Sequence, residues 1–189
     1  MQYSIEEAKT ETNLVRISED LKIPKSTLTR AVQQLESLRL ISSRNEGVSK
    51  WVTLKSGLDE TMRAAENALS SPVRKTVYLK TMPEGIQTKI SGIRALADMS
   101  MLAAKESDGS FAISKEEYRK IPGKDFISRQ EFRDFGGVVV EVWRYDPFLL
   151  SDDKYVDDLS LVLSLKDEPD ERVQKELDSI RQKYGIAEE

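Results

Sequence analysis

The sequence predicts an α+β fold in which a small helical domain with a β-hairpin precedes a larger mixed α/β domain. Apolar residues recur at helical spacing between residues 26 and 40, and they then alternate in strand fashion on both sides of Gly47. Ser70-Ser71-Pro72 interrupts this pattern, and the helices and strands beyond it do not alternate evenly, which favours α+β over a regular βαβ series. A chain of 189 residues accommodates two domains, and we expect them over residues 1–70 and 71–189.

The first segment, Leu14–Ile23, predicts a short strand that runs into one or two helical turns, and Pro24 ends it. Ser26 is suited to the N-cap of a second helix that continues to about Leu40. The apolar stripe of that helix consists of Leu28, Ala31, Val32, Leu35 and Leu38. This spacing is typical of an amphipathic helix with one buried face.

The opposite face of the same helix carries hydroxyl and amide side chains beside one arginine, namely Thr27, Thr29, Arg30, Gln33 and Gln34. An ordinary solvated helix face has a mixture of Glu and Lys instead. Short hydroxyls, amides and arginine suit the phosphates and base edges of DNA. The alternatives are a face that only meets solvent and a face that contacts protein.

A β-hairpin follows the helix. Ile41–Arg44 and Lys50–Leu54 alternate around Asn45-Glu46-Gly47, where Gly47 can adopt the positive φ that a tight turn requires. Helix, tight turn, second helix and basic hairpin is the element order of a winged helix-turn-helix, which places its second helix in the major groove of DNA. We therefore expect Thr27, Thr29, Arg30 and Gln33 to approach base edges, and Lys25, Ser26, Arg44 and Lys50 to hold phosphates.

The distribution of charge agrees with this expectation. The chain has a net charge of −4, yet residues 15–57 hold eight basic and four acidic side chains, a local charge of +4. Residues 76–189 hold 17 basic and 23 acidic side chains. Because attraction to phosphate is local at cellular salt, this asymmetry predicts two surfaces with different partners.

Residues 14–56 resemble the winged-helix domain of MarR-like bacterial transcriptional regulators, through ISEDLKIPKSTLTRAVQQLESLRLI and the hairpin after it. Lys22 and Arg39 stand where that family commonly has glycine. The family has a longer first helix, which Ser4–Lys9 could supply in short form. The resemblance implies a transcriptional repressor or autoregulator that binds double-stranded DNA, with a homodimer and a small-molecule effector among its expected partners.

Apolar residues at Leu58, Met62, Ala65 and Leu69 predict a helix over Ser56–Ser70, which either forms a dimer or packs the two halves together. Beyond it the pattern predicts strands at Arg74–Lys80, Phe111–Ser114 and Val138–Tyr145. It predicts a helix over Ile90–Ala104 with one face formed by Ile93, Leu96, Ala97 and Met101. It predicts two further helices, from Asp157 with Leu159, Val162 and Leu163 inward, and from Asp170 with Val173, Leu177, Ile180 and Tyr184 inward.

Composition excludes much of enzyme chemistry. The chain has no Cys and no His, which removes thiol nucleophiles, disulfides and imidazole bases. The start has no signal-peptide pattern, and no apolar run approaches the ~20 residues that span a bilayer, so we expect a cytoplasmic protein. We interpret the chain as a binding protein without cofactor or metal, and not as an enzyme.

Three features of the second half have a chemical interpretation as well as a structural one. Gly136-Gly137 precedes a strand with Glu141, and Asp146 follows that strand, as in nucleotidyltransferases. Trp143, however, stands where the second metal-binding acid would be. The acids between Asp152 and Asp158 fit helix capping better than a cation site. A helix that could hold an anion on its backbone N–H groups opens with Lys89, Ile90, Ser91 and Gly92, although an ordinary helix start explains these residues too.

Residues 76–185 resemble the carboxy-terminal domain of AbiEi-like antitoxins, through Ile90-Ser91-Gly92, Ala95-Leu96-Ala97, Glu141-Val142-Trp143 and Tyr145-Asp146-Pro147. The resemblance implies a degraded nucleotidyltransferase-like core and a toxin protein as partner. The alternative function is therefore an antitoxin of a toxin-antitoxin pair that also represses its own operon. An active nucleotidyl-transferring enzyme is the third hypothesis.

Overall fold

The computed structural model describes residues 11–65, 68–103 and 109–184, so the short helix considered over Ser4–Lys9 lies outside the described residues. The fold combines helices with two β-sheets, which confirms the mixed α+β prediction. The chain divides into two compact units, Met1–Leu69 with Tyr184–Glu189, and Ser70–Lys183. Within the described ranges, no helix has both the length and the apolar character needed to cross a membrane.

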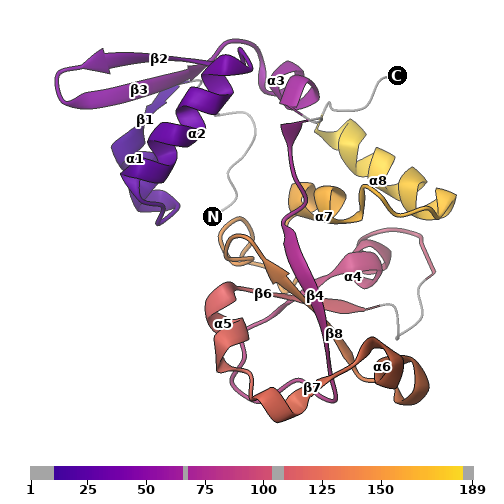
Figure 1. The fold of residues 1–189 in the computed structure, drawn as a ribbon. Helices are drawn as coiled ribbons and strands as arrows, with labels where there is room; N and C mark the ends of the chain where they lie inside the picture. The colour runs from indigo at the N-terminus through magenta and orange to yellow at the C-terminus, as the bar shows by residue number, and fades with distance from the viewer. Residues whose placement is uncertain (1–10, 66–67, 104–108, 185–189) are drawn as a thin grey trace. The chain divides into compact units, whose positions relative to one another are not determined.

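The amino-terminal unit has a three-stranded antiparallel sheet in the order β1-β3-β2 (Figure 1). The strands are β1 (Glu11–Asn13), β2 (Ile41–Glu46) and β3 (Ser49–Leu54), and the helices are α1 (Leu14–Asp20), α2 (Lys25–Ser37) and α3 (Leu58–Ala65). A strand at Leu14 was a wrong prediction. The Asn13 side chain accepts a hydrogen bond from the Arg16 amide at 2.8 Å, so the strand ends at Asn13 and the helix begins at Leu14.

The apolar side of α2 is buried as the spacing predicts. Leu28 and Val32 are buried in one cluster with Leu14, Leu40, Ile41, Val52 and Ala65. Leu38 was predicted to join them, but it follows the helix as its C-cap and is 49% exposed. The helix is therefore shorter than predicted.

The amino end of α2 also differs from the prediction. The N-cap is Pro24 and not Ser26, and the Pro24 carbonyl accepts hydrogen bonds from the amides of Thr27 at 2.9 Å and Leu28 at 3.2 Å. Proline has a fixed φ compatible with a helix start, which explains why the helix begins one residue before Ser26.

Lys22 and Arg39 adopt left-handed backbone conformations, with φ of 52° and 60°. Each follows the C-cap of a helix. After α1, the amide of Ile23 donates to the carbonyl of Ser18 at 3.2 Å. After α2, the amide of Leu40 donates to the carbonyl of Leu35 at 3.0 Å. These bonds are typical of Schellman helix ends, which usually use glycine. The two departures from the MarR-like pattern thus fall where glycine would relieve strain.

The β2–β3 hairpin extends away from the helices (Figure 1). Its register pairs Glu46 with Ser49, so the turn is formed by Gly47 and Val48 and not by residues 45–47. Gly47 has a φ of 58°, as predicted for the turn glycine. Val48 lies at the tip with its side chain fully exposed.

The carboxy-terminal unit is built on a five-stranded sheet in the order β5-β6-β8-β4-β7. Its strands are β4 (Val73–Leu79), β5 (Lys89–Ser91), β6 (Ser110–Ile113), β7 (Phe126–Ile127) and β8 (Val138–Trp143). Only the β6–β8 pair is parallel among the strand pairs of the described residues. Three of these strands, β4, β6 and β8, were predicted within two residues of their ends.

Helices cover both faces of this sheet. They are α4 (Gly92–Met99), α5 (Lys115–Lys120), α6 (Arg129–Phe135), α7 (Asp158–Leu165) and α8 (Glu171–Lys183). Successive strand residues point to opposite faces, and Ala112 and Trp143 pack with α4, α7 and α8 whereas Ile113 and Val142 pack on the α5 side. Figure 1 shows α4, α7 and α8 on one side of the sheet and α5 on the other.

A single helix over Ile90–Ala104 was a wrong prediction. Ile90 belongs to β5, where its amide and carbonyl bond to Lys154 and Val156, and the helix begins only at Gly92. Met101, expected on the inner face, is 96% exposed. The helix from Asp157 was correct in its N-cap, but Leu161 and Leu165 are buried in place of Leu159 and Leu163.

The helix from Asp170 is confirmed, with Val173 and Leu177 buried and Ile180 packed beside them. No element was predicted between residues 115 and 135. The helices α5 and α6 in this region nevertheless have N-cap residues that the sequence shows. Ser114 and Ser128 each accept a hydrogen bond from the amide of the glutamate three residues later.

We predict that Arg39→Gly is more stable than Arg39→Ala by about 1 kcal/mol, because alanine keeps the cost of the left-handed conformation and glycine removes it. Both variants lose the same charge and the same side-chain atoms beyond Cβ. The free energies of unfolding are compared by urea denaturation followed by circular dichroism. Equal stability of the two variants would contradict the left-handed assignment of Arg39.

Candidate functional site

The structure exposes all of the predicted side chains of α2 and places all of them except Thr27 on one side of the helix. Lys25, Ser26, Thr27, Thr29, Arg30 and Gln33 are all exposed, whereas Leu28 and Val32 on the other side are buried. At about 100° per residue, Lys25, Ser26, Thr29, Arg30 and Gln33 fall within an arc of about 140°. We call this surface the α2 polar arc. Because the apolar stripe of α2 is buried, the α2 polar arc faces solvent.

Two side chains of the α2 polar arc bend back along the helix. The Thr29 hydroxyl donates to the Lys25 carbonyl at 2.9 Å, and Arg30 Nε donates to the Ser26 carbonyl at 3.5 Å. The guanidinium of Arg30 is therefore held toward the amino end of α2. Lys25 and Arg30 therefore place two positive charges near the first turns of the helix.

The first turn of α2 has the properties of an anion-binding helix end. No side chain of the described residues caps its backbone N–H groups, and its first turn has no acidic residue. The acidic residue of this helix is Glu36, near its other end, where the Ser43 hydroxyl on β2 donates to it at 2.5 Å. The amides of Thr27 and Leu28 already donate to the Pro24 carbonyl, so the N–H groups of Lys25 and Ser26, together with the helix dipole, are the ones that favour a negative ligand at the amino end.

The two basic residues of the hairpin lie on opposite faces of it. Lys50 pairs with Asn45, and Arg44 pairs with Trp51, so the side chains of Lys50 and Arg44 alternate. Lys50 shares its face with Val52, which is buried against the helices. The structure therefore brings Lys50 to the helix side of the sheet and separates Arg44 from the α2 polar arc.

Arg44 is also occupied by carboxylates. Its guanidinium lies 2.9 Å from Glu11 and 2.8 Å from Glu46, and its Cζ is 5.7 Å from the centre of the Trp51 ring. Hydrogen bonding to Glu11, and then to Glu46, raises the pKa of Arg44. A phosphate at Arg44 would therefore have to compete with the carboxylates of Glu11 and Glu46. The spacing of residues in the sequence did not reveal these two ion pairs.

In the carboxy-terminal unit, the Ser91-Gly92 and Glu141-Trp143 segments meet in one hydrogen-bonded network. Ser91 and Ser110 share a hydrogen bond of 2.9 Å between their hydroxyls, and Ser110 donates to Glu141 Oε1 at 2.9 Å. Trp143 Nε1 donates to Glu141 Oε2 at 3.1 Å. Both oxygens of Glu141 thus accept hydrogen bonds from the protein. Ser110 was missed, because nothing in the sequence shows that β6 lies between β5 and β8.

The acids considered for metal or nucleotide chemistry have structural partners. The Asp146 side chain accepts the amide of Phe148 at 3.0 Å, Asp157 caps α7, and Asp158 lies 2.8 Å from Lys183. Among the residues that the structure describes, no three His, Cys, Asp or Glu side chains gather where they could hold a metal ion.

Lys89 was predicted to open a helix with Ile90, Ser91 and Gly92, but it is a buried lysine of β5, and the helix begins only at Gly92. Lys89 is 1% exposed, and its ammonium donates to the backbone carbonyl of Asp153 and lies 4.7 Å from the centre of the Phe148 ring. Burial lowers the pKa of Lys89, while the surrounding aspartates act in the opposite direction. Lys89 thus ties the loop that contains Phe148 and Asp153 to β5.

Comparison of the chain with protein-family models, with curated proteins and with solved structures found no match.

We predict that Gly92→Ala destabilises the protein by about 2 kcal/mol, for two reasons that can be separated. Gly92 has a φ of 64°, and a Cβ there would lie 2.4 Å from the Ser110 hydroxyl oxygen. Ser110→Ala removes that oxygen but not the backbone strain. Thermal unfolding should therefore show that Gly92→Ala costs less in the Ser110→Ala background. Strictly additive losses would contradict the close approach.

Proposed function

We propose that this chain is a DNA-binding transcriptional regulator, a repressor or autoregulator, in which residues 1–70 form a winged helix-turn-helix. The observation that carries the proposal is the α2 polar arc, where hydroxyl, amide and cationic side chains share the exposed side of one helix. The element order β1-α1-α2-β2-β3 supports it, because a short connection links the two helices and a hairpin follows them. The MarR-like resemblance of residues 14–56 points to the same class.

In this proposal α2 enters the major groove of double-stranded DNA with its amino end first. In this position, residues near the amino end of the helix contact base edges, namely Thr27, Thr29, Arg30 and Gln33. Lys25, Ser26 and the backbone N–H groups of the first turn hold a phosphate at the edge of the groove. Lys50 holds a second phosphate from the hairpin.

The carboxy-terminal half, residues 71–189, is the regulatory or partner-binding domain in this proposal. One observation favours the second candidate function, an antitoxin that also represses its own operon. Ser91-Gly92 and Glu141-Val142-Trp143, two of the segments that resemble AbiEi-like antitoxins, contact each other through the Ser110 hydrogen bonds. A neighbouring gene whose product stops growth unless this protein is present would support that candidate, and a gene without such a neighbour would count against it.

We predict that Arg30→Ala weakens specific DNA binding by about 1 to 3 kcal/mol and relaxes the sequence preference at one position. Genomic fragments retained by the full chain are selected and sequenced, and binding of the consensus fragment is then measured for each variant. Arg63→Ala is the matched control, because Arg63 is an exposed arginine on α3. An unchanged consensus and affinity after Arg30→Ala would contradict the role of α2.

We predict that the two hairpin cations differ in their effect on DNA binding. Lys50→Ala should lower the affinity and reduce the slope of log affinity against log salt by about one, because one phosphate contact is lost. Arg44→Ala should change the slope little, because Glu11 and Glu46 already compensate its charge. A larger change for Arg44→Ala than for Lys50→Ala would show that the hairpin meets DNA with its other face.

A further inference from the structure

The outer edge of β4 is paired along only part of its length. On one side, β4 pairs with β8 from Val73 to Leu79. On the other side, β7 pairs with Tyr78 and Leu79 alone. Among the residues that the structure describes, no strand pairs with residues 73–77 on that side, which we call the open β4 edge. At about 3.3 Å per residue, five residues of extended backbone offer an edge of about 16 Å.

The backbone of Thr76 points into the open β4 edge. The amide of Lys80 donates to the Asp125 carbonyl, just before β7, at 3.1 Å, so Lys80 faces the β7 side of the strand. Successive residues of a strand direct their backbone groups to opposite edges, so Tyr78 and Thr76 face the same side as Lys80. Tyr78 pairs with Ile127 there, whereas Thr76 has no strand partner on that side in the described part of the chain. Thr76 therefore directs one N–H and one C=O away from β8.

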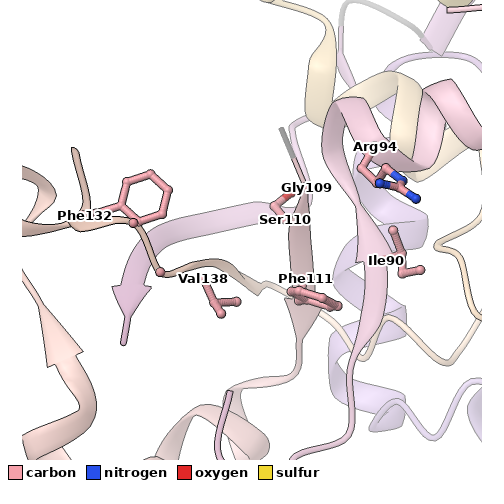
Figure 2. A pocket seen from close by; sticks show the side chains of 9 residues that line it. Ile90, Arg94, Gly109, Ser110, Phe111, Phe132 and Val138 are labelled. Atoms are coloured by element: carbon pink, nitrogen blue, oxygen red, sulfur yellow. The ribbon is translucent and has the colours of Figure 1, made fainter. Parts of the chain in front are cut away.

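The carboxyl end of β4 is covered, which confines the open edge to the first part of the strand. The ring of Phe132, on α6, lies 4.9 Å from the ring of Tyr78, measured between their centres. Figure 2 shows Phe132 and Val138, which line the same cavity at the start of β8. Residues 74–76, in contrast, are all exposed to solvent.

The open β4 edge carries positive charge. It includes Arg74 and Lys75, and β4 has no acidic residue. The Lys75 ammonium lies 3.5 Å from the centre of the Tyr118 ring, so this charge is on the α5 face of the sheet. Arg144 is exposed at the same end of β4, where its amide donates to the Pro72 carbonyl at 2.8 Å. A second copy of the chain would bring the same cations against this edge, so charge opposes self-pairing and favours an acidic strand.

We propose that the open β4 edge binds an extended acidic segment of a protein partner, which pairs with Thr76 as an added strand. Main-chain hydrogen bonds to an exposed sheet edge are a recurrent means of binding extended peptides. An acidic residue opposite Lys75 would complete a cross-strand pair of opposite charge. The site lies in the carboxy-terminal unit, and it does not depend on DNA binding by α2.

Amide hydrogen exchange of the full chain tests the open edge without any ligand. The amide of Thr76 should exchange roughly tenfold or more faster than the amide of Val77, because Val77 faces β8 and Thr76 does not. Equal protection of the two amides would show that the edge is covered in the folded protein, and it would overturn the proposal.

Binding is tested with a synthetic heptapeptide of alternating threonine and glutamate, blocked at both ends and titrated into the isotope-labelled full chain. The matched neutral probe has glutamine in place of glutamate. The acidic peptide should slow exchange of the Thr76 amide and shift the amide resonances of residues 73–77. It should bind roughly fivefold more tightly than the neutral peptide, because only the acidic peptide forms cross-strand pairs of opposite charge.

Two variants separate backbone pairing from charge. Thr76→Pro removes the outward N–H and no bond to β8, and an edge strand tolerates proline at such a position, so this variant should fold without binding the peptide. Lys75→Gln should weaken binding roughly twofold to fivefold. Lys175→Gln is the matched control, because it removes an exposed lysine of α8, on the other face of the sheet, and it should leave binding unchanged.

Each outcome decides for or against the site. The exchange measurement and the comparison of the two peptides need no variant, so they decide even if Thr76→Pro does not fold. Absence of binding by the acidic peptide, or equal binding of the two peptides, would overturn the proposal. A dimer of the chain that Thr76→Pro dissociates would also overturn it, because the occupant of the edge would then be a second copy.

Discussion

Burial of Leu28 and Val32 is the interaction on which the amino-terminal unit depends. These side chains pack with Leu14 from α1 and Val52 from β3, so one cluster holds the helices and the sheet together. Because α2 has a single apolar side, its burial also determines which side chains meet solvent. The hydroxyl, amide and cationic residues of the α2 polar arc are exposed as a direct consequence. Packing and the proposed recognition of DNA therefore use opposite sides of the same thirteen-residue helix.

Periodicity was sufficient to locate α2, the hairpin and the strands β4, β6 and β8, because each has a run of regularly spaced apolar residues. It did not locate the start of α2, because Ser26 was predicted as the N-cap and the N-cap is Pro24. The hairpin turn was placed one residue too early, and that error concealed the separation of Arg44 from Lys50. Register decides the face of every strand residue, and a shift of one residue reverses it. The short helices α5 and α6 offer too few turns for periodicity, although their serine caps are visible in the sequence.

The carboxy-terminal unit depends on contacts that no local pattern reveals. The hydrogen bonds of Ser91, Ser110 and Glu141 require β6 to lie between β5 and β8. This strand order is visible only in the folded sheet and not in the sequence. The environments of Lys89 and Gly92 could not be predicted for the same reason, because each residue contacts a strand or loop that is distant in sequence. These polar groups hold the start of α4 in place.

The claim that α2 is a DNA-binding surface is tested most directly by nuclear magnetic resonance of the isotope-labelled full chain. Duplex DNA recovered by fragment selection is added at low salt, and the shift of each backbone amide resonance is followed. We predict the largest shifts at Lys25 to Gln33 and at Lys50, with little change across the five-stranded sheet. Shifts confined to the carboxy-terminal unit, or no shifts at all, would contradict it.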